Sequence, residues 1–183
     1  MGSPIRILIL LLFLIPTIAH AEIEKIAQTS EKGICLAWWP KMHPVKGWHH
    51  EQDPSIANGI NIQVPDGFTY SDAETVIYAA ALYKPRNPET TSLEMLINDD
   101  KEEFIKKWPG IKISEENPIV TEDGNKLKSY TFFPTEKGNW EQVSYGEEGD
   151  FYLIFTISSR SYEGFTKALG VYRRYIGQYK EKP

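Results

Sequence analysis

The distribution of apolar and polar residues predicts a series of strands joined by short turns. Residues 60–64 alternate strictly, so three aliphatic side chains share one face of a half-buried strand. Residues 75–83 are continuously apolar, and their short length favours a buried central strand over a helix. Residues 151–157 are the most apolar segment beyond the N-terminal region and are expected at the centre of the sheet. Further strands are predicted at 33–38, 111–113, 126–133 and 140–145, with hairpin turns at 122–125 and 147–150.

Two segments have the three- and four-residue spacing of amphipathic helices. The first opens at a capping-box pair, Thr91 and Glu94, and stops before a Pro-Gly pair. Asp100 and Glu103 form a second such pair, so a kink or a split at that point is an alternative. The second helix opens at Ser161, and its apolar stripe is interpreted as a core face rather than a ligand site. These apolar faces comprise Leu93, Leu96, Ile97, Phe104 and Trp108 in the first helix, and Phe165, Leu169, Tyr172, Ile176 and Tyr179 in the second.

Strands that follow one another through turns, with two main helices packed on them, predict an α+β domain with a largely antiparallel sheet. Residues 22–183 contain no repeat, linker or low-complexity segment, so a single globular domain is expected there. Residues 22–32 are expected to form a loosely held entry segment. Residues 41–58 are expected to form a loop that carries Pro and His residues.

The turn after the strand at 60–64 has an apolar-Pro-x-Gly-aromatic sequence, Val64-Pro65-Asp66-Gly67-Phe68. A mid-chain helix, a Gly-turned hairpin and a closing helix follow in that order. This turn and this order resemble those of the Mog1/PsbP-like domains over most of the chain beyond residue 21. The resemblance implies an α/β/α sandwich, with helices on both faces of an antiparallel sheet, and a role in binding or assembly. It assigns no functional residue to a position of this chain.

The N-terminal segment has the pattern of a cleavable secretory signal. Arg6 precedes an uninterrupted apolar run, and Ala19 and Ala21 are small residues that signal peptidase accepts before Glu22. The apolar run is shorter than the ~20 residues that span a bilayer. Residues 1–21 are therefore predicted to be removed, which leaves a periplasmic or secreted protein with no stable membrane insertion.

Charge and cysteine content narrow the choice of partner and compartment. The chain carries a formal net charge of −5, which argues against nucleic acid as a partner. Cys35 is the only cysteine and cannot close an internal disulfide. Its apolar neighbours predict a buried, inert thiol. An exported chain without a disulfide framework suits a bacterial periplasm somewhat better than a eukaryotic secretory route.

Metal-binding chemistry is concentrated between the first two predicted strands. His43, His49, His50 and Glu51 offer the imidazole and carboxylate groups that zinc, copper or nickel binds. Their spacing matches no known metal signature, and adjacent residues of an extended backbone point to opposite faces. The alternatives are a metal site at these four residues and a polar, partly buried loop whose histidines titrate near pH 6.

The same region carries three tryptophans, Trp38, Trp39 and Trp48. They could form an exposed platform on which a sugar or a peptide stacks. The other interpretation is that they close one end of the sheet, because large aromatic side chains commonly seal the edge of a core. The second interpretation is the one that the residue types favour.

The remaining motifs do not define a reaction. The chain has no Gly-x-Ser-x-Gly, Ser-x-x-Lys, His-Glu-x-x-His or phosphate-binding loop. Glu147, Glu148 and Asp150 crowd one predicted turn, where a solvated acidic turn is favoured over a calcium site. The sequence therefore favours a non-enzymatic binding or assembly module whose partner is another exported protein. The alternatives are a small metal-binding protein or metal-dependent enzyme, and a carbohydrate-binding protein that uses the tryptophans.

Overall fold

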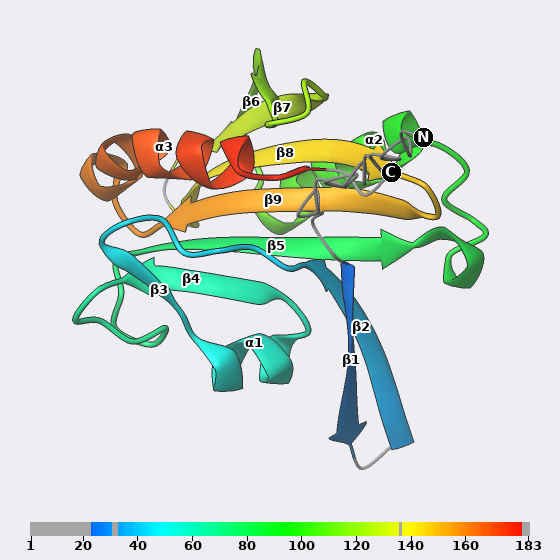
Figure 1. Ribbon diagram of the computed structural model, residues 1–183. Coiled ribbons are helices and arrows are strands. Elements are labelled where there is room, and N and C mark those ends of the chain that lie inside the picture. The colour runs from blue at the N-terminus through cyan, green and yellow to red at the C-terminus, as the bar shows by residue number, and fades with distance from the viewer. Residues whose placement is uncertain (1–22, 31–32, 136, 181–183) are drawn as a thin grey trace, which may run out of the picture.

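An open antiparallel sheet organises the chain, with strands in the order β1-β2-β5-β9-β8-β7-β6 and with β3 and β4 beside β5 (Figure 1). The computed structural model describes residues 23–30, 33–135 and 137–180. Every strand pairing within these ranges is antiparallel. The strands are β1 (Ile23–Ser30), β2 (Gly33–Pro40), β3 (Trp48–His50), β4 (Asn61–Pro65), β5 (Thr75–Tyr83), β6 (Lys112–Val120), β7 (Lys126–Phe133), β8 (Trp140–Glu148) and β9 (Phe151–Ser159). The helices are α1 (Gln52–Asn58), the short 3-10 helix η1 (Lys84–Arg86), α2 (Leu93–Lys107) and α3 (Tyr162–Gly177).

Strands β5 and β9 form the middle of the sheet and pair with each other along their whole length. In β5 the alternate residues Ile77, Ala79 and Ala81 are buried on one face. Strand β9 lies between β5 and β8, and nearly all of its residues are buried. The predicted central strands at 75–83 and 151–157 are therefore confirmed.

The two long helices pack on opposite faces of this sheet. Phe155 of β9 contacts a core that includes Tyr172 and Ile176 of α3. The next residue back along β9, Ile154, points to the other face and packs against a core that includes Ile97 of α2. Figure 1 shows α3 crossing in front of β8 and β9, with α2 behind them. The expected α+β class with a largely antiparallel sheet is confirmed.

Both helix starts are set by serine side chains. The Ser161 hydroxyl caps α3 by accepting a hydrogen bond from Gly164 N at 2.9 Å, as predicted. In α2 the cap is Ser92 rather than Thr91, and the Ser92 hydroxyl accepts from Met95 N at 3.1 Å. Helix α2 continues through Asp100 without a break, so a split there was wrong. No helix within the described ranges is both long enough and apolar enough to cross a bilayer.

The region before β4 is more ordered than its polar sequence predicts. Residues 23–30 form β1 rather than a loose entry segment, and the expected loop at 41–58 contains β3 and α1. Ser55 explains part of this order, because its hydroxyl donates to Glu51 O at 2.6 Å and accepts from Ile62 N at 2.8 Å. One buried side chain thereby joins the short helix α1 to strand β4.

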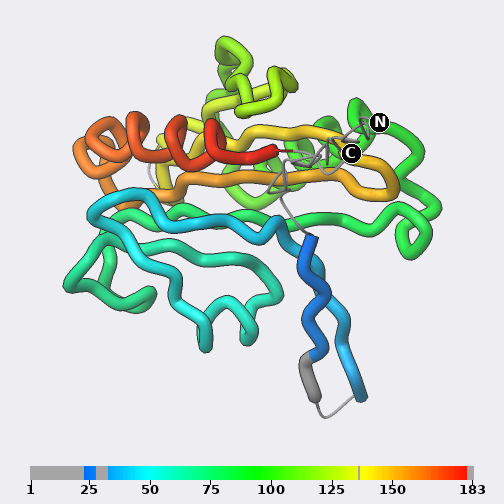
Figure 2. The backbone as a smooth tube through the Cα atoms, in the orientation of Figure 1, coloured from blue at the N-terminus to red at the C-terminus, as the bar shows by residue number. Residues whose placement is uncertain are grey.

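Strands β1 and β2 form a hairpin that projects from the rest of the sheet (Figures 1 and 2). Its register to the sheet rests on one residue pair, Trp38 of β2 with Ala81 of β5. The hairpin is exposed toward its tip, where Ile34 is 74% exposed. Cys35 is also exposed, so the prediction of a buried thiol was wrong. The predicted signal at residues 1–21 lies outside the described residues.

Candidate functional site

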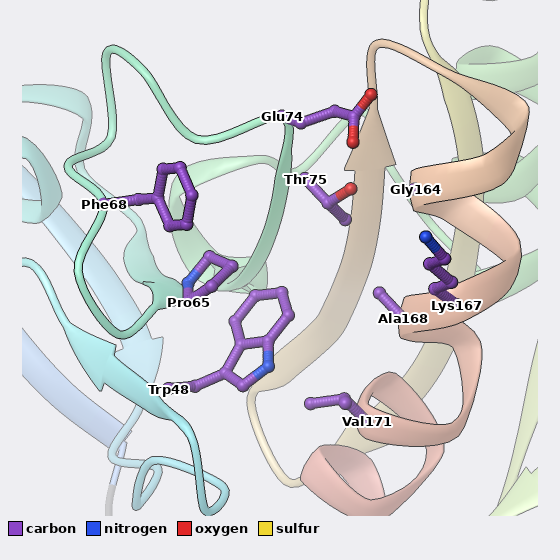
Figure 3. Close-up of a pocket in the computed structure, with 9 residues that line it drawn as sticks. All are labelled: Trp48, Pro65, Phe68, Glu74, Thr75, Gly164, Lys167, Ala168 and Val171. Atoms are coloured by element: carbon purple, nitrogen blue, oxygen red, sulfur yellow. The ribbon is translucent and has the colours of Figure 1, made fainter.

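A groove of about 290 Å³ separates α3 from the segment that leads into β5 (Figure 3). Trp48, Pro65 and Phe68 line one wall, and Ala168 and Val171 of α3 line the other. The Phe68 side chain is 51% exposed, although a large aromatic residue normally gains from burial. The groove therefore presents an apolar surface to solvent from both sides.

The turn at 65–68 positions the first wall. Phe68 N donates to Pro65 O at 3.1 Å, which closes a tight turn. Gly67 has a φ of +86°, a left-handed conformation that residues with a Cβ rarely adopt, so glycine is needed there. Asp66 N donates to Gly47 O at 2.9 Å and fastens the turn to the segment before β3. Phe68 thus extends from an anchored backbone.

Residues 69–74 continue this wall to β5 and are held by Arg160, in the link between β9 and α3. The Arg160 guanidinium donates from Nη2 to the carbonyl oxygens of Asp72 and Ala73, both at 2.6 Å. Within the loop, Thr69 N donates to Asp72 Oδ1 at 2.6 Å, and this hydrogen bond lowers the pKa of the Asp72 carboxyl. The wall facing α3 is consequently a braced loop.

The groove ends in a polar cluster at the N-terminus of α3. The Thr75 and Ser159 hydroxyls are 2.7 Å apart and share a hydrogen bond. Gly164 lies so close to them that a Cβ at this position would be 2.7 Å from both hydroxyl oxygens. Helix α3 can therefore come this close to the two hydroxyls only because residue 164 is glycine. Glu74 and Lys167 complete this end of the groove (Figure 3). The site therefore combines apolar walls with one charged, hydrogen-bonding end.

The structure does not bring the four predicted metal ligands together. His49 Nε2 lies 3.3 Å from Glu51 Oε1, whereas the ring of His50 contacts the Ser55 hydroxyl at 2.9 Å. His43 is exposed. Across residues 23–30, 33–135 and 137–180, no group of three or more His, Cys, Asp or Glu side chains is placed to hold a metal ion. Burial lowers the pKa of His50, opposed by nearby carboxylates.

The three tryptophans also occupy separate places. Trp39 is 2% exposed, and its Nε1 donates to Glu24 Oε2 at 3.3 Å, so this side chain is structural. Trp38 packs against Tyr83 with ring centroids 5.2 Å apart, at the base of the projecting hairpin. Trp48 alone lines the groove. A joint platform of all three was wrong, and one of them remains a candidate ligand contact.

The acidic turn between β8 and β9 has its carboxylates directed apart. Glu147 forms an ion pair with Lys84 at 2.5 Å, and the Lys84 ammonium also donates to Gly149 O at 2.7 Å. Glu148 is buried and accepts a hydrogen bond from the Tyr179 hydroxyl. A turn with one carboxylate paired and another inside the protein offers no converging set of calcium ligands.

A second polar group lies under α2, on the opposite face of the sheet. Burial raises the pKa of Glu141 to about 6, and the Ser158 hydroxyl donates to its Oε1 at 2.7 Å. Burial also raises the pKa of Asp100, which accepts a hydrogen bond from the Tyr145 hydroxyl. These half-buried carboxylates are covered by a helix, whereas the groove beside α3 is open.

Of the residues that line the groove, Trp48 was predicted from the sequence as a candidate ligand contact, and the others were not. Phe68 and Pro65 lie in the apolar-Pro-x-Gly-aromatic turn, which was noted as a fold feature but not as a site. Ala168 and Val171 are three residues apart on α3, beside its inner stripe, and this second apolar row was the available signal. The chain matches no protein-family model and no curated protein, so its function has to be inferred from the groove itself.

Proposed function

We propose that this protein is an exported, non-enzymatic binding module that takes an apolar side chain of a partner protein into the groove beside α3. The observation that carries the proposal is the facing pair of apolar walls, with Trp48 and Phe68 opposite Val171. A volume of about 290 Å³ is at the small end of the range for ligand sites, which suits one anchoring side chain. Full burial of such a side chain contributes about 1.5–3 kcal/mol.

The fold adds support at the level of class. Helices α2 and α3 pack on opposite faces of an antiparallel sheet, and the Val64–Phe68 turn forms part of the groove. We extend the proposal to an α/β/α sandwich of the Mog1/PsbP-like kind, whose members usually serve as binding or assembly modules. The braced loop at 69–74 fits this role, because a preorganised wall loses little conformational entropy when a partner binds.

A carbohydrate ligand is the second candidate. The Trp48 indole offers a flat apolar face for a sugar ring, and Thr75, Glu74 and Lys167 offer hydrogen-bonding groups at one end of the same groove. This candidate predicts stacking at Trp48 without a requirement for Phe68. The two candidates are therefore separable by one set of variants.

The test is selection of peptides from a random linear library on the full-length mature protein, followed by affinity measurement with fluorescent copies of the selected peptides. We expect an aromatic or aliphatic anchor to be enriched, and Phe68→Ser to weaken binding about tenfold or more, equivalent to about 1.4 kcal/mol. Ile105→Ser is the matched control, because Ile105 is also 51% exposed but lies on α2. This control should bind as the wild type does.

Two outcomes would contradict the proposal. If the library yields no peptide that Phe68→Ser weakens selectively, the groove does not bind a partner segment. If maltotriose, cellotriose or chitotriose quenches the fluorescence of wild type and Phe68→Ser but not that of Trp48→Phe, the site is a sugar site instead. Thermal unfolding of each variant checks that the fold is intact.

A further inference from the structure

A second hollow, of about 530 Å³, lies next to the groove along α3. Pro44, Val45 and Lys46 line one side of it, and the C-terminal part of α3 contributes Arg173 and Arg174. Gln178 and Gly177 complete its lining. The segment between β2 and β3 runs beside α3 here, as the tube in Figure 2 shows.

The groove and the second hollow share the same two walls. On α3, Val171 lines the groove, and Arg174 lines the second hollow one turn further on. On the facing wall, Trp48 lines the groove and Val45 lines the hollow, and Trp48 N donates to Val45 O at 2.9 Å. The two depressions therefore lie end to end in one trough along α3.

The second hollow is distinctly cationic. Lys46, Arg173 and Arg174 are exposed there, and no carboxylate of the residues that the structure describes lines the hollow. None of these three cations forms a salt bridge with a carboxylate in the described part of the chain. Three exposed cations gathered in one hollow, in a chain of net charge −5, form a local site for negative charge.

The length of the trough indicates an extended ligand. From Gly164 to Gln178 the helix rises about 21 Å, at 1.5 Å per residue. An extended peptide covers that distance with about six residues, at 3.3 Å per residue. An apolar anchor in the groove would then place the following residues of the same segment beside Arg173 and Arg174.

Resting on the proposed function, we propose that the trough binds an extended peptide segment of a partner protein in which acidic residues adjoin the apolar anchor. The groove buries the anchor, and the cations pair with the carboxylates. Exposed ion pairs add little affinity individually, but they fix register and select against basic segments. The charge pattern of the trough thus determines which apolar segments are accepted.

The test uses three synthetic fluorescent peptides with the same leucine-phenylalanine anchor and glutamates, glutamines or lysines on one side of it. For the wild type, we expect the glutamate peptide to bind more tightly than the glutamine peptide, and the lysine peptide to bind most weakly. The preference should shrink as salt rises, because the charges are exposed. Arg174→Glu should weaken the glutamate peptide at least about threefold and improve the lysine peptide.

Lys106→Glu is the matched control, since Lys106 is likewise a basic residue in the last turn of a helix but lies on α2. This variant has the same net charge as Arg174→Glu and should keep the wild-type order of affinities. Phe68→Ser should weaken all three peptides alike. This result would show that Phe68 contacts the apolar anchor and that the charge preference comes from other residues.

Other results would overturn the inference. If Phe68→Ser weakens the binding of all three peptides and Arg174→Glu changes the affinity of none, the groove binds a partner but the cations do not contribute to selecting its charge. If no peptide responds to either variant, the proposed function fails as well. If heparin binds the wild type and loses affinity with Arg174→Glu but not with Phe68→Ser, the hollow is a separate polyanion site.

Discussion

At the scale of single residues, the least ordinary side chains are the two carboxylates under α2. Glu141 occupies the same face of β8 as Val143 and Tyr145, a face otherwise filled by apolar core. Asp100 projects from α2 between Ile97 and Phe104, which pack into that core. Burial of a charged carboxylate is unfavourable, so folding raises the pKa of both groups.

The raised pKa of Glu141 predicts a specific pH dependence of stability. The unfolded chain releases this proton near pH 4.5, whereas the folded protein holds it to about pH 6. The free energy of unfolding should therefore fall as pH rises through this window, by about 2 kcal/mol from this group. Glu141→Gln should remove that fall and stabilise the protein at pH 7, as measured by urea unfolding at pH 4.5 and pH 7.

The exposed Glu115, on β6, provides the control. Glu115→Gln should leave the pH profile of stability unchanged. If Glu141→Gln destabilises the protein equally at both pH values, the carboxylate is needed as a hydrogen-bonding group and the pH argument is wrong.

The positions of these carboxylates were readable from periodicity, but the environments of other residues were not. Asp100 falls on the apolar stripe of its helix, and Glu141 on the buried face of its strand. Cys35, in contrast, has apolar neighbours in sequence but lies near the exposed tip of the projecting hairpin. The local sequence pattern indicates which residues lie on the same face of a strand or helix. Whether another element covers that face depends on the tertiary structure.

At the scale of elements, helix α3 packs one face on the sheet and also forms one wall of the groove. Its inner stripe packs on β9, as the spacing of aromatic residues predicted. The Tyr172 hydroxyl is fully buried, donates to Phe155 O at 2.7 Å and shares a 2.8 Å hydrogen bond with the Ser144 hydroxyl. Burial raises the pKa of Tyr172 far above its usual range, so the hydroxyl stays protonated.

Tyr172→Phe should lower the free energy of unfolding by about 1–3 kcal/mol, because it leaves buried acceptors without their donor. Denaturant unfolding measures this change. Tyr162→Phe is the control on the same helix, since Tyr162 is 56% exposed, and it should change stability by less than about 0.5 kcal/mol. Equal effects of the two substitutions would show that the buried hydroxyl contributes nothing particular.

Elements with clear apolar periodicity were predicted well, and those without it, including the eight-residue β1 and the short α1 and β3, were missed. Strands β5 and β9 and helices α2 and α3 carry enough residues for their periodicity to be visible. Helix α1 has seven residues and β3 has three, so each depends on contacts with residues elsewhere in the chain, such as the hydrogen bond from Ile62 N of β4 to the Ser55 hydroxyl of α1. The groove could not be predicted from local pattern either, because its two walls are far apart in the chain.

At the scale of the whole molecule, the proposed export makes a direct prediction about the mature N-terminus. If the chain is exported as proposed, protein isolated from its native host should begin at Glu22, because the predicted signal-peptidase site follows Ala21. Intact mass and N-terminal peptide analysis measure this. Ala21→Arg should retain residues 1–21, because the cleavage site then lacks its small residue. A native product that still carries the first 21 residues would contradict the account of export.

The order of strands in the sheet has a consequence for biosynthesis. Strand β9 is the last strand along the chain to be synthesised among those described and lies between β5 and β8, so a growing polypeptide lacks the middle of its own sheet until β9 has been made. Pairing of β5 with β9 joins residues as much as 84 positions apart, and such distant contacts form slowly. The topology therefore delays closure of the sheet, and for a chain exported as proposed this delay would lengthen the time in which translocation machinery can act on the unfolded polypeptide.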